Sequence, residues 1–311
     1  MIGGLSGRDF LSACDLNPEE ALGILDLAAR VKENPSEYSE ALTGQVLVLL
    51  FEKPSLRTRV TFETGMLTLG GKVVSLAHDM VRMGDREPVG DVGRNLERWV
   101  QAIVSRTFKH RTLEELAEAA SIPVINALSD QEHPCQAFAD FQTIREQFGD
   151  SKPAITYIGD GNNVCHSLLL LGAMLGYEVR VASPEGYLPE NRIAERAEAL
   201  AGENGGTIRI GSDPKEMAQG AQVLYTDVWT SMGQEEEAEK RLDAFRGFQV
   251  NANLLGVASA GARVMHCLPA HRGEEISSEV LESPASIVFD QAENRLHAQK
   301  ALLLGVLGKG D

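Results

Sequence analysis

The sequence predicts an α/β protein built from two doubly wound parallel-sheet domains. Short apolar runs alternate with longer amphipathic segments along the whole chain, which is typical of parallel strands joined by helices. The alternation stops at Asp150-Ser151-Lys152-Pro153 and then begins again. We therefore expect a first domain over residues 1–150 and a second over 151–311, whose last helix could pack back on the first domain.

The composition excludes several classes of protein. The chain has 311 residues, of which 43% are hydrophobic, so it can form two cores, and its net charge of -16 argues against nucleic acid or an anionic membrane as the main partner. The four cysteines are scattered and form no CxxC pair, which predicts neither a zinc site nor a disulfide framework. No signal peptide and no membrane-spanning run is visible, so we expect a cytoplasmic protein.

The first domain begins with a helix whose start is marked by Asn17-Pro18-Glu19-Glu20, a capping side chain followed by proline and acids. Its expected buried face comprises Leu22, Leu25, Ala28 and Val31. The strands that follow are predicted at 46–50, 72–76, 102–104 and 123–126. Helices are predicted at 60–69, around Val92, Leu96, Trp99 and Val100, at 113–120, and from the 129–136 segment to Gly149.

The second domain repeats the alternation. Strands are predicted at 154–158, 178–182, 207–210, 223–226, 263–266 and 286–289. A helix is predicted at 164–175, and a long final helix at 291–307.

An anion site is predicted where the first strand leads into a helix through Ser55-Leu56-Arg57-Thr58-Arg59. A helix N-terminus offers unpaired N–H groups, and arginine binds phosphate through a rigid fork. Taken alone, the motif also fits a capped helix with surface arginines. However, Arg106 and His133 also lie just beyond strand ends, and parallel sheets bind ligands at that edge. The three motifs together favour a ligand site.

Gly159-Asp160-Gly161-Asn162-Asn163 is a partial dinucleotide-binding pattern. Val164 replaces its helix-packing glycine, and the next strand ends at Ser183-Pro184 without an acid for a ribose. These departures disfavour a nicotinamide cofactor. We expect the two glycines to let the backbone pass close to a small ligand.

Two later motifs carry further polar groups. Asp227 and Ser231 belong to a loop that could bind an ammonium group, or could simply be solvated. Cys267 ends a strand, where a buried thiol is more often inert than reactive. His133 would usually be a packing or capping residue, but its neighbours favour a ligand role.

Seven motifs resemble those of the aspartate/ornithine carbamoyltransferase family. They are Ser55-Leu56-Arg57-Thr58-Arg59, Arg106, His133-Pro134-Cys135-Gln136, Asp160-Gly161-Asn162-Asn163, Asp227 with Ser231-Met232-Gly233, His266-Cys267-Leu268-Pro269 and Glu293-Asn294-Arg295. The resemblance implies an active site in the cleft between two domains, a homotrimer or a multiple of it, and no cofactor or metal. It further implies transfer of a carbamoyl group from carbamoyl phosphate to the δ-amine of L-ornithine, giving L-citrulline and phosphate, in arginine metabolism.

The resemblance also assigns residues to each substrate. Carbamoyl phosphate would bind to Ser55, Leu56, Arg57, Thr58, Arg106, His133 and Gln136, with Cys267, Leu268 and Arg295 reaching it from the second domain. Catalysis would involve Arg57, Thr58, Arg106, His133 and Cys267. Ornithine would bind to Asn163, Asp227, Ser231 and Met232. Many family members carry glutamine two residues before Gly84, in a loop that approaches a neighbouring subunit, whereas this chain has Arg82 there.

Three alternatives remain open from the sequence. The acceptor could be another amine, such as an acylated ornithine, putrescine or aspartate. A nicotinamide-dependent oxidoreductase and a non-catalytic binding or scaffold protein are the other two.

Overall fold

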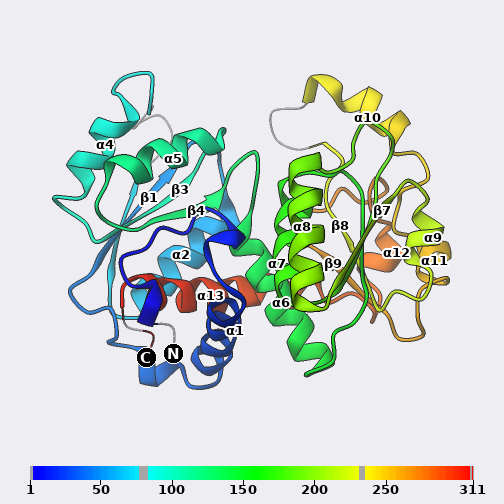
Figure 1. Cartoon of the computed structure of the whole chain (residues 1–311), viewed down its shortest axis with the longest axis horizontal. Helices are drawn as coiled ribbons and strands as arrows, with labels where there is room; N and C mark the ends of the chain where they lie inside the picture. Colours follow the sequence, from blue (N-terminus) through cyan, green and yellow to red (C-terminus); the bar gives the residue numbers. More distant parts are fainter. Residues whose placement is uncertain (1–2, 77–82, 231–234, 309, 311) are drawn as a thin grey trace. The chain divides into compact units, whose positions relative to one another are not determined.

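A computed structural model describes residues 3–76, 83–230, 235–308 and 310. The chain divides into two compact units, here called unit 1 (Met1–Gln142 with Glu293–Asp311) and unit 2 (Thr143–Ala292). Each unit contains one parallel sheet covered by helices (Figure 1), which confirms the predicted fold class. Among the described helices, none is both long and apolar enough to cross a membrane.

The sheet of unit 1 has the strand order β2-β1-β3-β4. Its strands are β1 (Val46–Phe51), β2 (Lys72–Leu76), β3 (Ala102–Arg106) and β4 (Val124–Leu128). The chain passes from β1 outward to β2, then returns to β3 on the other side of β1, and all three pairings are parallel. The loops after β1 and β3 therefore diverge at a topological switch point, where open α/β sheets bind their ligands.

Helices cover both faces of the unit 1 sheet. They are α1 (Pro18–Glu33), α2 (Leu56–Thr68), α4 (Val89–Leu96), α5 (His110–Ala119), most of α6 (Pro134–Phe148) and most of α13 (Val288–Val306), with short 3-10 turns at Gly3–Leu5, Ala13–Asp15 and Pro35–Tyr38. On one face α4 and α5 pack on Val48, Leu50 and Ile103, and α2 and α13 lie on the other (Figure 1).

Two helix starts are set by their first residues. Asn17 Oδ1 accepts the Glu20 N–H at 2.9 Å while Glu20 Oε2 accepts the Asn17 N–H at 3.0 Å, so α1 begins with the predicted cap. Helix α2 begins at Leu56, earlier than the predicted start at residue 60, with Ser55 as its N-cap. The earlier start places Arg57 and Thr58 in the first turn of α2.

Unit 2 contains a sheet with the order β7-β6-β5-β8-β9. Its strands are β5 (Ile155–Ile158), β6 (Glu178–Ala182), β7 (Thr207–Gly211), β8 (Val223–Thr226) and β9 (Arg263–His266). The helices are α7 (Asn163–Met174), α8 (Asn191–Asn204), α9 (Pro214–Ala218), α10 (Ala238–Ala244), α11 (Ala252–Leu255) and α12 (Ser278–Leu281), with a 3-10 turn at Glu235–Glu237. The switch point lies between β5 and β8, so the loops after these two strands share one edge.

Three predictions about elements are wrong. No strand forms at 286–289, because Ser286 makes only an isolated bridge to Val264 and Val288 already begins α13. Leu22 is 45% exposed, since the buried stripe of α1 runs through Ala21, Ile24 and Ala28 instead. Trp99 is 67% exposed, because α4 ends at Leu96 before its next turn would bring residue 99 onto the core.

Candidate functional site

The N-terminus of α2 has the features of an anion site. Ser55 has extended backbone angles (φ -156°, ψ 110°), and its side chain makes no capping hydrogen bond. The first turn carries no acidic residue. Arg57 is half-buried, and its guanidinium has no hydrogen bond or ion pair among the residues described here. The helix end thus offers N–H groups, a hydroxyl and a guanidinium that a bound anion can use.

A buried chain of hydrogen bonds lies beside this helix end. Arg295 Nη2 donates to Thr58 Oγ1 at 2.7 Å, and its Nη1 donates to Gln136 Oε1 at 2.9 Å. Gln136 Nε2 in turn donates to Asp140 Oδ1 at 2.8 Å. The four side chains connect α2, α6 and α13, and all are nearly inaccessible to solvent. These bonds fix which way the Gln136 amide faces and hold the Arg295 fork in place.

Arg106 and His133 are two further candidate residues of unit 1. Arg106 is the last residue of β3, His133 immediately precedes α6, and both are buried. Burial, and then the positive charges of Arg295 and Arg106, hold the pKa of His133 well below its usual value. The imidazole is therefore neutral at pH 7, and the positive charge comes from the guanidinium groups.

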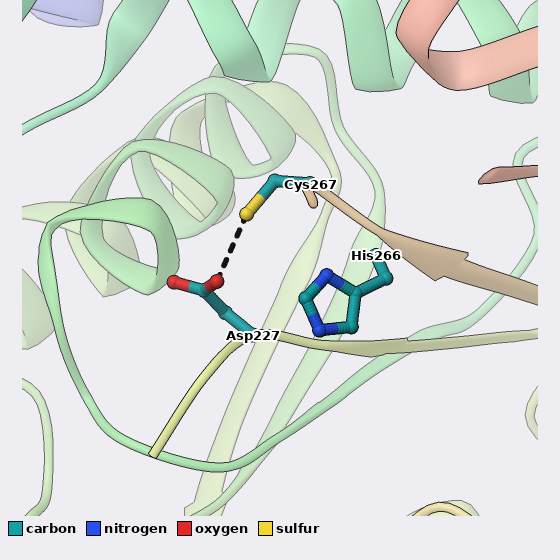
Figure 2. A group of neighbouring side chains, drawn as sticks. All are labelled: Asp227, His266 and Cys267. Carbon is teal, nitrogen blue, oxygen red and sulfur yellow. Dashed lines mark hydrogen bonds between the residues drawn. The ribbon is translucent and has the colours of Figure 1, made fainter. Parts of the chain in front are cut away.

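In unit 2, Asp227 lies just after β8 and is held by two partners. Cys267 Sγ donates to its Oδ1 at 2.9 Å, and Asn162 Nδ2 donates to its Oδ2 at 2.9 Å. Figure 2 shows the thiol pointing toward the carboxylate. Asn162 also caps α7, since its Oδ1 accepts the N–H groups of Val164 and Cys165. The carboxylate thus stands at the switch point between β5 and β8.

A second acid at this edge is already neutralised by an arginine. Arg241 Nη1 donates to Asp160 Oδ2 at 2.9 Å and to the Trp229 carbonyl at 2.8 Å, and its guanidinium lies 4.9 Å from the centroid of the Tyr187 ring. Burial raises the pKa of Asp160 to about 6, although Arg241 acts in the opposite direction. Because Asp160 is engaged by Arg241, Asp227 is the carboxylate better placed to meet a cationic ligand.

The turn after β9 is positioned by His266. Its Nε2 is 2.9 Å from Glu275 Oε1, and its Nδ1 accepts the Leu268 N–H at 2.9 Å. Leu268 has φ 58°, a left-handed conformation that is rare for a branched residue and often found at functional sites. The buried His266–Glu275 pair therefore sets the backbone on which Cys267 and Leu268 are carried.

The side chains of Asp227, His266 and Cys267 do not suit a metal ion. Asp227, His266 and Cys267 have potential ligand atoms within 4.8 Å of one another (Figure 2). Both ring nitrogens of His266 are nevertheless engaged, by Glu275 and by the Leu268 N–H. Only a carboxylate and a thiol then remain, fewer than the three or four protein ligands of a zinc site.

Gly161, in the 159–163 turn, packs closely against another part of the chain. A Cβ at Gly161 would lie 2.2 Å from the Pro189 nitrogen and 2.4 Å from the Leu188 carbonyl carbon. The glycine thus lets the turn pack against the chain's own backbone, and its expected approach to a small ligand stays a prediction. Asn163, predicted to bind ornithine, is the half-buried first residue of α7.

Some predicted site residues cannot be placed, and one has an unexpected location. Ser231, Met232 and Arg82 lie outside the described residues. Arg295 was expected to reach the first substrate from the second domain, but it belongs to unit 1. Its hydrogen bonds to Thr58 and Gln136 are therefore contacts within one unit.

Comparison with protein families gives two matches that together span most of the chain. Residues 8–146 match the carbamoyl-P binding domain of aspartate/ornithine carbamoyltransferases, and residues 151–306 match their Asp/Orn binding domain. The chain belongs to the aspartate/ornithine carbamoyltransferase family.

Relatives in this family are similar over nearly their full length. An ornithine carbamoyltransferase of Parasynechococcus marenigrum is 50% identical over 98% of this chain and 95% of its own, and one of Listeria innocua is 48% identical over 97% and 96%. Among solved structures, the ornithine carbamoyltransferase of Pyrococcus furiosus has a TM-score of 0.95 at 48% identity and covers 98% of each chain. That of Giardia lamblia has a TM-score of 0.88 at 34% identity, covering 96% of this chain and 97% of the other.

Three residues of this family member had no role assigned from the sequence. Asp140 orients Gln136, Asn162 holds Asp227, and Glu275 supports His266. Only Asn162 had a local signal, since asparagine before a helix is a common N-cap. Asp140 lies one helical turn after Gln136, a spacing that permits a side-chain contact but does not indicate its role.

Proposed function

We propose that the chain transfers the carbamoyl group of carbamoyl phosphate to the δ-amine of L-ornithine, giving L-citrulline and phosphate. The observation that carries the proposal is the buried Arg295–Thr58–Gln136 arrangement beside the N-terminus of α2. It combines donors for a phosphate with an oriented amide for a carbamoyl group. The family matches and the names of the relatives support the same reaction.

Carbamoyl phosphate would bind to unit 1. Its phosphate would be held by Ser55, the Leu56 and Arg57 N–H groups and the Arg57 and Arg106 side chains, because a helix N-terminus and guanidinium groups are suited to an anion. Thr58, Arg106 and His133 would donate to the carbonyl oxygen. Gln136 and the Leu268 carbonyl would face the amide nitrogen.

Ornithine would bind through residues of unit 2. Asp227 would attract its α-ammonium, and Asn163, Ser231 and Met232 would contact the rest of the amino acid. The proposal is supported by the hydrogen bonds that hold Asp227 and by the engagement of Asp160 with Arg241. Cys267 would be an ornithine contact, since its thiol already donates to Asp227.

The proposed reaction needs positioning and electrostatic stabilisation rather than a covalent intermediate. As the δ-nitrogen bonds to the carbonyl carbon, negative charge grows on the carbonyl oxygen. The C–O bond to phosphate then breaks with its electron pair going to the phosphate, which takes up the surplus proton of the nitrogen. Arg57, Thr58 and Arg106 would stabilise that charge, and the neutral His133 would act as an N–H donor. Each such donor contributes about 3–4 kcal/mol, and alignment of two small substrates contributes roughly 7–11 kcal/mol.

A citrulline-formation assay tests the proposal directly. Purified protein is incubated with carbamoyl phosphate and ornithine, and in parallel with N-acetylornithine, putrescine or aspartate. We expect ornithine to react best, and to react faster as pH rises from neutral, because roughly one δ-amine in a thousand is uncharged at pH 7. Preference for another amine, or a rate that does not change with pH at low ornithine, would contradict it.

We also propose a homotrimer, or a multiple of it, working in arginine metabolism in the cytoplasm. Support comes from exposed apolar residues along α2 and the adjacent edge strand β2, namely Leu56, Val60, Leu67 and Val74. Apolar patches of this kind commonly mark interfaces between proteins. Light scattering on wild-type and Val60→Glu protein tests this: we expect three chains per particle for the wild type and smaller particles for the variant.

A further inference from the structure

His110, the first residue of α5, is a buried histidine that the proposed reaction does not use. Its Nδ1 lies 2.8 Å from the hydroxyl oxygen of Ser129, which is also buried. His110 comes shortly after β3 ends, and Ser129 directly follows β4. The contact therefore joins the segments that follow two neighbouring strands of the unit 1 sheet.

Ser129 organises the turn of residues 129–132, which His133 follows. Its N–H donates to the Glu132 carbonyl at 2.9 Å, and its Oγ accepts two N–H groups of the same turn at 3.3 Å each. Because both lone pairs of the hydroxyl are used in this way, its own proton can be donated to Nδ1 of His110. The imidazole therefore fixes the orientation of the hydroxyl on which the turn is built.

A second bond fastens the 129–132 turn to the start of α5. Asp130 Oδ1 accepts the His110 N–H at 2.8 Å. Lys109, the N-cap residue of α5, makes no side-chain capping bond, so the Asp130 carboxylate caps this helix in its place. The helix dipole also favours a negative charge there. His110 thus holds the turn both by its ring and by its backbone.

The position of His133 depends on this turn. On its C-terminal side, the His133 carbonyl accepts two N–H groups of α6, at 3.0 Å and 3.3 Å, so the helix fixes the backbone there. On its N-terminal side, His133 is joined directly to the 129–132 turn. Arg106, by contrast, is paired with both neighbouring strands of the sheet. A shift of the turn would therefore move His133 more than Arg106.

We propose that His110 is a positioning residue for His133. By holding Ser129 it fixes the 129–132 turn, and so directs the His133 imidazole at the carbonyl oxygen of carbamoyl phosphate. The inference rests on the proposed function, in which His133 donates to that oxygen as negative charge grows on it. His110 itself would touch neither substrate. Its effect on the rate arises because a displacement of about 1 Å at a reacting group can cost a large factor in rate.

Three substitutions of His110 identify the atom that matters. His110→Asn keeps an amide group where Nδ1 stood, His110→Gln places its amide where Nε2 stood, and His110→Leu keeps neither. We expect kcat for citrulline formation to fall by about tenfold in the leucine and glutamine variants, and to stay within about threefold of the wild type in His110→Asn. Wild-type kcat in His110→Leu, or the same kcat in all three variants, would overturn the inference.

A double-mutant cycle with His133→Gln tests the route of the effect. If His110 acts through His133, the tenfold effect of His110→Leu should shrink to less than about twofold once His133 is replaced. Calorimetry with inorganic phosphate should give an affinity within about twofold of the wild type for His110→Leu, because His133 does not hold the phosphate. A merely structural disturbance would weaken phosphate binding and lower kcat equally in both backgrounds, and either result would overturn the inference.

Ser129→Ala removes the same hydrogen bond from its other side, and we expect the same pattern in the cycle and in phosphate binding. Urea unfolding establishes that each variant is folded. If His110→Leu does not fold, Ser129→Ala takes its place, and an effect that persists in the His133→Gln background would overturn the inference.

Lys109→Met is the matched control. Lys109 also contacts the 129–132 turn, at 3.2 Å from Asp130, but its side chain is 75% exposed. We expect kcat within about twofold of the wild type, because exposed ion pairs contribute little. A loss as large as that of His110→Leu would overturn the inference. Citrulline formation by the wild type tests the proposed function separately: if it is present while the cycle is additive, only the positioning role fails.

Discussion

Arg295 Nη2 donates a hydrogen bond of 2.7 Å to Thr58 Oγ1, joining α13 to a helix 237 positions earlier in the sequence. The same guanidinium donates to Gln136 Oε1 from its other terminal nitrogen. One side chain therefore orients both a hydroxyl and an amide that would face the carbamoyl group. Because Arg295, Thr58 and Gln136 are buried, neither contact is readily replaced by water.

Replacing Arg295 by methionine should lower kcat/KM for carbamoyl phosphate by roughly a hundredfold to a thousandfold, the usual effect of losing one preorganised donor. The Arg295→Lys variant should recover little of the lost kcat/KM, because a single ammonium lacks the planar fork that reaches two acceptors. Steady-state kinetics of both variants provides the measurement. A lysine variant with wild-type kcat/KM would show that the fork is not needed.

Arg57→Ala should abolish citrulline formation while changing the free energy of unfolding by less than about 0.5 kcal/mol. The reason is that the Arg57 side chain has no hydrogen bond or ion pair to lose in the described part of the chain, whereas the bond from Thr61 to its backbone carbonyl is kept. Arg59→Ala is the control two residues later, where the side chain is 49% exposed and its guanidinium is paired with Glu63. Urea unfolding and the citrulline assay measure the two effects. Near-normal turnover in Arg57→Ala would place the phosphate elsewhere.

His133→Gln should reduce kcat by about a hundredfold or more and should alter how stability depends on pH. The folded protein holds the pKa of His133 well below 6.5, so only the unfolded chain takes up this proton readily. The stability contributed by the neutral histidine is thus present above about pH 6.5 and is lost as pH falls. Urea titrations between neutral and mildly acidic pH should show the wild type losing more stability on acidification than His133→Gln. Parallel curves would contradict the depressed pKa.

Asp160→Asn should show the opposite pH dependence. The pKa of Asp160 is raised from 3.8 to about 6 in the folded protein, so folding favours its protonated form at low pH. That contribution is complete below about pH 4 and is lost as pH rises to about 6. Relative to Asp160→Asn, the wild type should therefore become less stable over this interval, which urea unfolding at a series of pH values would reveal. A difference that stays constant would mean that Arg241 keeps Asp160 ionised throughout.

The sequence predicted the sheets well, because most of their strands are short, continuous apolar runs, although the edge strands β2 and β7 are only partly buried. Residues 72–76 form β2 as predicted, and 46–50 form β1 extended by Phe51. Prediction failed at 286–289, where Ser286 alone bridges Val264 before α13 begins at Val288. A short apolar run such as residues 287–289 fits a buried strand or the first turn of a helix equally well, and only its neighbours in space decide.

The candidate site was predicted at the level of single residues but not as a network. Ser55, Arg106 and Asp227 follow predicted strands, so the parallel topology alone brings them to ligand-binding edges. The pairing of Asn162 with Asp227 spans 65 positions, and that of Gln136 with Arg295 spans 159. No local pattern carries such contacts, because they depend on which elements pack together.

Unit 1 contains Met1–Gln142 and Glu293–Asp311, so most of α13 leaves the ribosome only after all of unit 2. Until it emerges, α2 lacks its buried partner Arg295, and an apolar side of the sheet has no covering from α13. A nascent or prematurely terminated polypeptide that contains unit 2 but not α13 would accordingly be inactive. The uncovered apolar side of its unit 1 sheet would be bound by chaperones or exposed to proteolysis.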